Sequence, residues 1–363
     1  MRIALVSDCF LPRVGGIELQ VHDLARQLVR AGHSVTVLTT TAGPPATTTF
    51  PVVRLPALAG IPLPAAADVL RNGMSRFDVV HAHTSLISPL SWQAARIAQA
   101  GGVGTVVTLH SLPGPTVLWP PAWLDRRLGD VGWTAVSDVV ADVLRRSLPG
   151  RTVDVLHNGI DAAAWRRPRR SGHPLTIVST MRLTRRKRPV ALVRTLELIR
   201  DQLPPGRAVR AILAGAGPQA QTVAAEVRRR GMSEWVRLPG RLTRHELQQL
   251  YAGADVYLAP AELESFGVAA LEARCAGLPV VAMASGGVGE FVRHGIEGFL
   301  VDSDTAMAAT TAALLTDREL LARMQVHNRS TDPVMTWDDV VVRHLAAYRT
   351  QRALSGLSLA SAP

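Results

Sequence analysis

The segment RIALVSDCFLPRVGGIELQVHDLARQLVRAGHSVTVLTT, residues 2–40, decides the fold class. Its first six residues form a short, mostly apolar run that is typical of a β-strand. Residues 17–30 then follow a helical period, with the apolar side chains on one face. Gly32 ends this helix, and residues 34–40 form a second strand-like run. The segment is therefore predicted to be a β-α-β unit.

Strand-like runs alternate with helical stretches through the rest of the chain. Further strands are expected at 52–55, 78–81, 105–109, 133–136, 153–156, 175–180, 209–214, 236–238, 255–259, 279–282 and 299–301. This alternation predicts parallel, doubly wound sheets. The polar segment WRRPRRSGHP, residues 165–174, interrupts it and is typical of an interdomain linker.

We therefore predict an α/β protein with two Rossmann-like domains, at 1–168 and 174–335. A C-terminal helix at 336–353 is expected to pack back on the N-terminal domain. Open α/β sheets bind ligands at the carboxyl ends of their strands. If two such domains face each other, the cleft between them is the expected active site.

Composition narrows the class of protein. The chain has 363 residues, of which 47% are hydrophobic and 19% charged, with a formal net charge of +11. Two distant cysteines, Cys9 and Cys275, indicate neither a disulfide framework nor a metal site. The N-terminal apolar run is too short for a signal peptide, and we find no apolar run of about 18 residues that could span a membrane. We expect a cytoplasmic protein.

Gly15 and Gly16 stand between the first predicted strand and the first predicted helix. Glycines here let a ligand approach the backbone, and a helix N-terminus favours an anion. The spacing differs from the dinucleotide pattern G-x-G-x-x-G, and a tight turn explains the pair equally well. Both glycines are candidate ligand-binding residues.

Three histidines, His81, His83 and His110, are expected to end two strands of the first domain. No HExxH motif or Cys/His cluster accompanies them, which argues against zinc. A histidine at a strand end is more often structural than catalytic. His110 is the catalytic candidate, because it should point into the cleft.

Two basic residues, Arg182 and Lys187, follow the first strand of the second domain. An arginine fork and a lysine point charge at the carboxyl end of a strand suit a diphosphate. A solvated basic loop is the alternative. Lys187 is the only lysine in the chain, which favours a site that requires an ammonium group.

The segment ESFGVAALE, residues 264–272, carries two glutamates, with Glu264 just before a helix that is expected to start near residues 265–267 and Glu272 two turns into it. Eight positions along a helix correspond to about 12 Å, so Glu264 and Glu272 cannot share one proton. Separate roles are expected, with Glu272 accepting from a pair of hydroxyls. The amides around Ser265, Phe266 and Gly267 suit a phosphate. A solvated helix face is the alternative for either glutamate.

Together these segments resemble family 4 of the retaining glycosyltransferases, which have the GT-B fold. The resemblance covers almost the whole chain, and the early segments resemble phosphatidylinositol mannosyltransferases and the N-acetylglucosaminyltransferase subunit that begins GPI-anchor synthesis. The segments that carry it are SDCFLPRVGGIE (7–18), FDVVHAH (77–83), TLHS (108–111), AVSD (135–138), LHNGID (156–161), MRLTRRK (181–187) and ESFGVAALEARCAGLPVVA (264–282).

The resemblance implies a hexosyltransferase that uses a UDP- or GDP-sugar, retains the anomeric configuration and needs neither a metal nor a cofactor. The acceptor implied is a hydroxyl of a glycan, a lipid or a small molecule. Arg182 and Lys187 are then expected to hold the donor diphosphate, and Glu272 the ribose. Glu264 and the segment 266–267 are expected to hold the sugar. Gly15 and Gly16 are then candidate donor-binding residues, with Gly16 approaching the donor phosphate or the acceptor, and His110 would line the reaction centre.

Other functions remain open from the sequence alone. The high pI invites a nucleic-acid-binding function, but the arginine clusters are dispersed and aromatic residues make up only 4%. A dehydrogenase lacks its G-x-G-x-x-G, and a pyridoxal-phosphate phosphorylase needs a second lysine. A peripheral contact with the inner face of a membrane is a further hypothesis, based on basic residues beside tryptophans: Trp119, Trp123, Arg126, Arg127, Arg145 and Arg146. The alternative is that the tryptophans are buried and the arginines are merely solvated.

Overall fold

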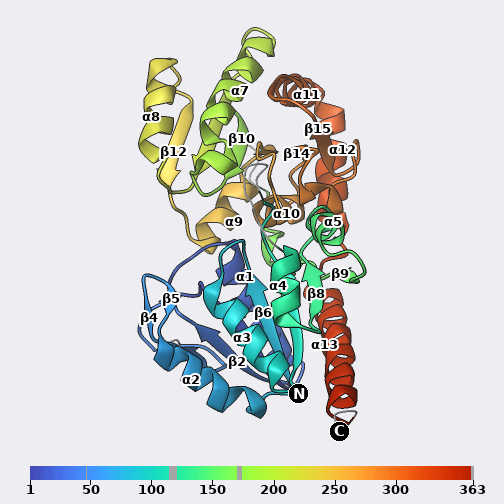
Figure 1. Ribbon diagram of the computed structural model, residues 1–363. Helices are drawn as coiled ribbons and strands as arrows, with labels where there is room; N and C mark the ends of the chain where they lie inside the picture. The colour runs from blue at the N-terminus through green and yellow to red at the C-terminus, as the bar shows by residue number, and fades with distance from the viewer. Residues whose placement is uncertain (46, 114–120, 170–173, 361–363) are drawn as a thin grey trace. The chain divides into compact units, whose positions relative to one another are not determined.

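The computed structural model describes residues 1–45, 47–113, 121–169 and 174–360, which divide into two α/β units (Figure 1). The first unit comprises Met1–Gly159 and the C-terminal segment from Trp337, and the second comprises Ile160–Thr336. Each unit has its own central sheet. The predicted α/β class with two Rossmann-like sheets is confirmed.

The sheet of the first unit has the strand order β3-β2-β1-β6-β7-β8-β9, and all its neighbouring pairs are parallel. The strand order reverses between β1 and β6, which is where such sheets bind ligands. The strands are β1 (Arg2–Ser7), β2 (Ser34–Thr39), β3 (Val52–Arg54), β6 (Val79–Thr84), β7 (Gly104–Leu109), β8 (Gly132–Ala135) and β9 (Val153–Val155).

Helices connect these strands, and the last helix returns to the same unit. Its helices are α1 (Gly16–Arg30), α2 (Pro64–Gly73), η1 (Met74–Arg76), α3 (Pro89–Ala100), α4 (Pro121–Leu128), α5 (Asp138–Ser147) and α13 (Trp337–Ala360). α13 packs on β7, β6 and α1. A small antiparallel hairpin, β4 (Ala57–Leu58) and β5 (Ile61–Pro62), precedes α2.

The second unit repeats this plan with the parallel order β12-β11-β10-β13-β14-β15. Its reversal point lies between β10 and β13. The strands are β10 (Leu175–Thr180), β11 (Val209–Ala214), β12 (Val236–Gly240), β13 (Val256–Ala259), β14 (Val280–Met283) and β15 (Gly298–Val301). The helices are α6 (Ala162–Trp165), η2 (Arg185–Lys187), α7 (Pro189–Gln202), α8 (Ala220–Arg229), α9 (Arg244–Ala252), α10 (Val268–Cys275), η3 (Gly287–Glu290), α11 (Asp304–Thr316) and α12 (Arg318–Ser330).

Side-chain caps fix where several helices begin. The hydroxyl of Ser137 accepts from an amide in the first turn of α5, and Ser303 does the same for α11. Thr243 and Glu246 form a reciprocal capping box at the start of α9. Pro64 stands in the first turn of α2, where its missing N–H leaves no hydrogen bond unmade.

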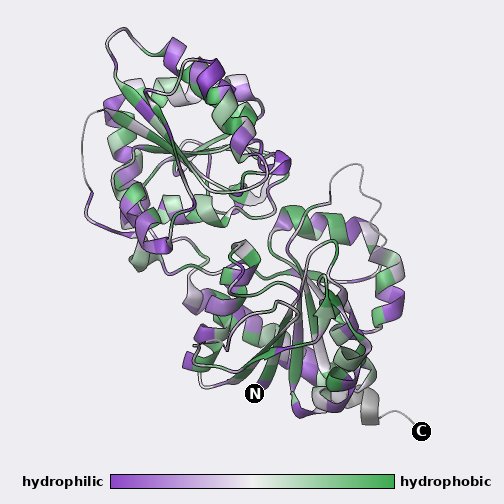
Figure 2. Cartoon of the chain, turned by 90° about the vertical axis from the view of Figure 1, so that its left-hand side faces the viewer, coloured by the Kyte–Doolittle hydropathy of each residue, from purple (hydrophilic) through white to green (hydrophobic). Residues whose placement is uncertain are grey.

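Apolar side chains from the strands and the inner helix faces form the core of each unit. In Figure 2 the central strands are mostly green, whereas many purple residues lie on the surrounding helices. Strands buried on both faces need this continuous apolar character, because helices cover both sides of a parallel sheet. The sheets therefore serve as rigid supports for the loops at their carboxyl ends.

The expected strands occur within a few residues of the predicted positions, with two informative differences. β6 continues to Thr84, beyond the predicted end at residue 81, because the histidines after Val80 are buried inside the unit. Residues 57–70 form the hairpin and most of α2, which the sequence analysis did not predict. The prolines in this segment interrupt the apolar pattern, so no helical or strand period can be detected there.

Candidate active site

In the second unit, the candidate donor-binding residues gather at the reversal point of the sheet. Lys187 lies in the loop that follows β10, and Glu264 lies in the loop that follows β13. Their side chains form an ion pair, with 2.5 Å between Nζ and Oε2. The exposed fractions of the two side chains are 28% and 18%. A cation and a carboxylate thus meet, partly accessible, where open α/β sheets bind ligands.

The neighbouring Arg186 ties the same two loops together. Its Nε and Nη2 donate to the carbonyl oxygen of Leu263, at 3.2 and 3.1 Å. Burial lowers the pKa of Arg186, while the negative charge of Glu264 opposes that shift. The guanidinium of Arg186 therefore holds the two loops together.

Arg182 lies on the outside of this loop. Its side chain is exposed, and the described part of the chain provides it with no ion pair. The backbone beneath it is fixed, because the Leu183 amide donates to Ala216 O at 3.0 Å and the Leu183 carbonyl oxygen accepts from Gln219 N at 2.9 Å. Arg182 therefore offers its guanidinium from a well-anchored loop.

The segment that anchors this loop was missed in the sequence analysis. Gly215 has φ +146°, and a Cβ there would lie 1.8 Å from the carbonyl oxygen of Met181. Only glycine allows the two loops to approach so closely. The sequence Gly215-Ala216-Gly217-Pro218 directly after β11 was the available signal, since glycines at the carboxyl end of a strand often permit such an approach.

The loop from Glu264 to Gly267 leads into α10. Gly267 is the N-cap residue and has φ +94°, a left-handed conformation that favours glycine. Ser265 is buried, and Phe266 is buried with its ring packed on Phe291 at a centroid distance of 5.5 Å. The Phe266 side chain thus belongs to the core. A ligand at this segment would therefore contact its backbone.

Glycines of the β14–η3 loop support this segment from the other side. The amide of Gly287 donates to Glu264 O at 2.8 Å, and a Cβ on Gly287 would lie 2.4 Å from Ser265 O. These glycines were not among the predicted site residues.

Glu272 lies inside α10 and is 9% exposed. α10 begins only at Val268, so Glu264 precedes the helix and the predicted rise along one helix does not describe the separation of the two glutamates. Their charges do reach a common neighbour: burial raises the pKa of Tyr257, and both carboxylates raise it further. The two glutamates therefore lie in one electrostatic neighbourhood without sharing a helix.

In the first unit, Gly15 and Gly16 lie at the start of α1. Gly15 is the N-cap residue, and a Cβ there would lie 2.4 Å from Oε2 of Glu18. Glu18 is buried and pairs with Arg13 at 3.2 Å. A Cβ on Gly16 would meet no atom within 4 Å. The glycine pair therefore presents open space above Gly16.

His110 directly follows β7, and its Nε2 lies 3.0 Å from Nδ1 of His83 on β6. Burial lowers the pKa of His110 to about 3, and the charge of His344 adds to the shift. Burial also lowers the pKa of His83 well below its usual range. Both imidazoles are therefore neutral at physiological pH.

His81 does not lie at a strand end, contrary to the prediction. It occupies the middle of β6 and belongs to a buried chain of hydrogen bonds. Tyr348 Oη lies 2.7 Å from His81 Nδ1, and His81 Nε2 lies 2.6 Å from Thr108 Oγ1. Thr108 Oγ1 lies 2.5 Å from Thr134 Oγ1, which donates to Val107 O at 3.2 Å.

The hydrogen bond from Thr134 to the Val107 carbonyl determines which atom donates in each of these linked hydrogen bonds, because a carbonyl oxygen only accepts. Thr134 donates to the carbonyl, so Thr108 donates to Thr134, and His81 Nε2–H donates to Thr108. Nδ1 of His81 then accepts from the Tyr348 hydroxyl. His81 is thus a structural residue that links α13 to the sheet.

A small pocket lies beside His83 and His110 within the first unit. Nε2 of His83 is buried and has no hydrogen-bond partner among the described residues. The lining contains no Arg, Lys, Asp or Glu; it consists of Gln20, Leu24, His83, Thr108, His110, Leu156, His157, Asn158, Gly159, Trp337, Val340 and His344. The pocket therefore suits neutral, hydroxyl-bearing groups or water.

Each unit has a parallel sheet with glycine-lined loops at its carboxyl end, and the second unit adds a basic loop, an arrangement typical of proteins with the GT-B fold. Residues 14–164 match the profile of Glycosyltransferase Family 4, and residues 162–331 match that of Glycosyl transferases group 1. The chain belongs to the family 4 glycosyltransferases with the GT-B fold. The predicted family is therefore confirmed.

Two curated relatives match this chain over most of their own length. A GDP-mannose-dependent alpha-(1-6)-phosphatidylinositol monomannoside mannosyltransferase of Mycobacterium tuberculosis is 28% identical, over 94% of this chain and 96% of its own. A glycogen synthase of the same organism is 30% identical, over 87% and 86%. The crystal structure of Anabaena HepE in complex with UDP and glucose superimposes with a TM-score of 0.75 at 21% identity, over 100% of both chains.

A membrane-spanning helix is not found among residues 1–45, 47–113, 121–169 and 174–360, since none of their helices combines the necessary length and apolar character.

Proposed function

We propose that this glycosyltransferase transfers a hexosyl group from a UDP- or GDP-sugar to an acceptor hydroxyl and retains the anomeric configuration. The observation that carries the proposal is the meeting of Lys187 and Glu264 at the sheet reversal of the second unit. The names of relatives support the donor class: one is GDP-mannose-dependent, and HepE was crystallised with UDP.

Arg182 and Lys187 are proposed to hold the donor diphosphate and to stabilise the charge that develops on it as the sugar leaves. Stabilisation of a developing charge by fixed groups is often the largest single contribution to catalysis. Two cations at this position also make a metal-independent reaction chemically reasonable, and no cofactor is needed.

Glu264 is proposed to exchange partners when the donor binds. Lys187 turns toward the diphosphate, and the carboxylate of Glu264 then accepts hydrogen bonds from the hydroxyls of the sugar. Glu272 accepts from the ribose hydroxyls, and the backbone at Ser265, Phe266 and Gly267 borders the sugar and phosphate. The leaving phosphate assists deprotonation of the acceptor on the same face of the sugar.

The residues of the first unit are proposed to serve the acceptor side. Gly16, with open space above it, allows close approach of the donor phosphate or the acceptor, next to Gly15. His110 is neutral, so it can donate or accept one hydrogen bond without adding a charge to the reaction centre. The acceptor itself is a glycan, a lipid or a small molecule.

A thermal-shift panel of UDP-, GDP- and ADP-sugars tests the donor class. We expect one UDP- or GDP-sugar to raise the melting temperature, because a ligand that binds the folded state stabilises it. The anomeric configuration of the product, read from its NMR coupling constants, then tests retention. An inverted product, or a shift with ADP-sugars alone, would contradict the proposal.

A further inference from the structure

Arg188 has an unusual backbone conformation for an arginine. Its φ is +53° and its ψ +41°, which is the left-handed region that favours glycine. It stands between η2, which ends at Lys187, and α7, which begins at Pro189. A residue in this region persists only where the surroundings over-determine it, and such residues cluster at functional sites.

The side chain of Arg188 provides that determination. Its Nη1 and Nη2 donate to the two carboxylate oxygens of Asp304, each at 2.9 Å. Nη1 also donates to Pro260 O at 3.0 Å, and Nη2 lies 3.2 Å from Glu262 Oε1. A two-pronged arginine–carboxylate pair fixes orientation as well as distance. Asp304 is the first residue of α11, so this contact ties Arg188 to a packed helix.

Arg188 is the third of three consecutive cationic residues whose side chains contact the loop that follows β13. Arg186 donates to Leu263 O, Lys187 pairs with Glu264, and Arg188 contacts Pro260 and Glu262. Among the described residues, the Lys187 side chain contacts only Glu264, whereas Arg186 makes two hydrogen bonds to one carbonyl oxygen and Arg188 contacts three residues. The geometry of Lys187 is therefore set from both sides.

We propose that Arg188 is a positioning residue that fixes the Lys187 ammonium for the donor diphosphate. The inference rests on the proposed function, in which Lys187 binds that diphosphate. Arg188 does not touch the ligand itself: its guanidinium is occupied by Asp304 and the 260–262 segment. Its side chain locks the left-handed turn, and the turn determines where the side chain of Lys187 begins.

Arg188→Gly tests the contribution of the side chain apart from that of the backbone conformation. Glycine adopts the same left-handed turn without steric penalty and lacks only the contacts of the guanidinium. We expect it to weaken the binding of UDP or GDP about fivefold to tenfold in isothermal titration calorimetry, a coupling typical of residues in one network. Asp304→Asn should weaken binding in the same direction. Arg194→Ala is the control, since this arginine of α7 has 61% of its side chain exposed and pairs with Glu226.

A double-mutant cycle with Lys187→Ala distinguishes positioning from a general structural role. If Arg188 acts through Lys187, Arg188→Gly combined with Lys187→Ala binds no more weakly than Lys187→Ala alone. Independent losses, or Arg188→Gly with a lowered melting temperature but wild-type affinity, would overturn the inference. A wild-type protein that binds neither UDP nor GDP would instead overturn the proposed function, and the inference with it.

Discussion

Lys187 Nζ lies 2.5 Å from Glu264 Oε2, so the only lysine of the chain is paired with the first glutamate of the ESFGVAALE segment. Without a donor, each residue satisfies the charge of the other. In the proposed function, a diphosphate competes for the ammonium, and sugar hydroxyls compete for the carboxylate. The proposal therefore assigns the pair a second role, which is to keep the two loops together until a donor replaces both halves of the contact.

Lys187→Ala and Arg182→Ala should each reduce turnover by about tenfold to a hundredfold, because each removes a positive charge from the leaving diphosphate. Initial rates of nucleotide release from the donor measure the effect. Arg145→Ala is the control, since its exposed guanidinium has, among the residues that the structure describes, only acidic side chains of α5 and the Val153 carbonyl as partners. Rates near wild type for both site variants would refute the diphosphate assignment.

Glu272→Gln and Glu264→Gln should affect different steps. Glu272→Gln is expected to weaken nucleotide binding several-fold, because it removes a charged acceptor from the ribose. Glu264→Gln should bind nucleotide normally and slow sugar transfer, since it acts on the sugar and leaves Lys187 available. Calorimetry with the free nucleotide and turnover assays separate the two. Equal nucleotide affinity for wild type and Glu272→Gln would disprove the ribose role.

The sequence predicts the sheets well because buried parallel strands carry a strong local signal. β10 and β11 occur at the predicted residues, since each is a continuous, largely apolar run between turns. Residues 57–70 lack such a period, so the hairpin and α2 could not be predicted. The polar His81 and His83 concealed the end of β6, because their burial depends on partners such as Tyr348 far away in sequence.

Part of the site was predictable, and part was not. Arg182 and Lys187 follow β10, and Glu264 follows β13, so the pairing of these two strands brings their loops together. The position of each motif directly after a predicted strand indicated that they belong to one site. The contacts of Arg188 with Asp304 could not be inferred, since 116 positions separate them and no local period links them. Gly215 and Gly287 serve close backbone approaches, which a single sequence does not distinguish from ordinary turns.

The hypothesis of a peripheral membrane contact requires an exposed tryptophan in the first unit. Trp123 on α4 is 46% exposed, and the guanidinium carbon of Arg127 lies 4.3 Å from its ring centroid. A buried Trp123 is thus excluded, while Trp119 lies outside the described residues. Exposed Arg126 and Arg127 beside this ring suit an anionic bilayer, each contributing about 1 kcal/mol near such a surface.

We expect the protein to sediment with anionic vesicles at low salt and to be released at high salt. Replacing both Arg126 and Arg127 by alanine should weaken this binding by about tenfold or more, given the contribution of each charge. Neutral vesicles are the control, because screening and lipid charge act only on the electrostatic part. Equal sedimentation with both vesicle types would exclude an electrostatic contact with the membrane and favour a soluble acceptor.

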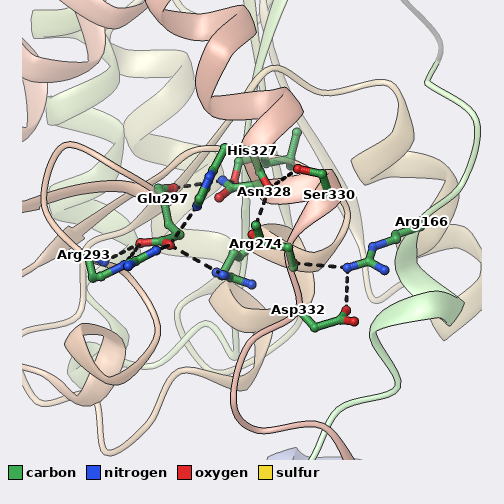
Figure 3. A network of polar contacts seen from close by, with 10 residues as sticks. Arg166, Arg274, Arg293, Glu297, His327, Asn328, Ser330 and Asp332 are labelled. Carbon is green, nitrogen blue, oxygen red and sulfur yellow. Dashed lines mark hydrogen bonds and ion pairs between the residues drawn. The ribbon is translucent and has the colours of Figure 1, made fainter.

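Glu297 is the centre of a buried polar network behind α10 in the second unit (Figure 3). It is 1% exposed, and it accepts from Arg293, while His327 Nε2 lies 3.0 Å from Oε1. Arg274 of α10 is also buried, with 3.7 Å between Nη2 and Glu297 Oε1. The Nε and Nη1 atoms of Arg274 have no partner among the described residues. The carboxylate therefore compensates a buried guanidinium that has few other contacts.

Loss of this carboxylate should destabilise the protein in a pH-dependent way. Burial alone raises the pKa of Glu297, but hydrogen bonds from Arg293 and His327 outweigh it and lower the pKa to about 2. Because the folded-state pKa lies below the unfolded one, the charge stabilises the fold above about pH 5, and this contribution is lost as the pH falls toward 2.

Glu297→Gln should therefore lower the free energy of unfolding by about 3 kcal/mol at pH 7, and the difference from wild type should narrow in acid. Denaturant titrations at several pH values measure it, with Glu319→Gln as the control, since that side chain is 90% exposed and lies 3.8 Å from Arg323. A difference that stays constant from pH 7 to pH 3 would show that packing, and not the charge of Glu297, holds this part of the unit together.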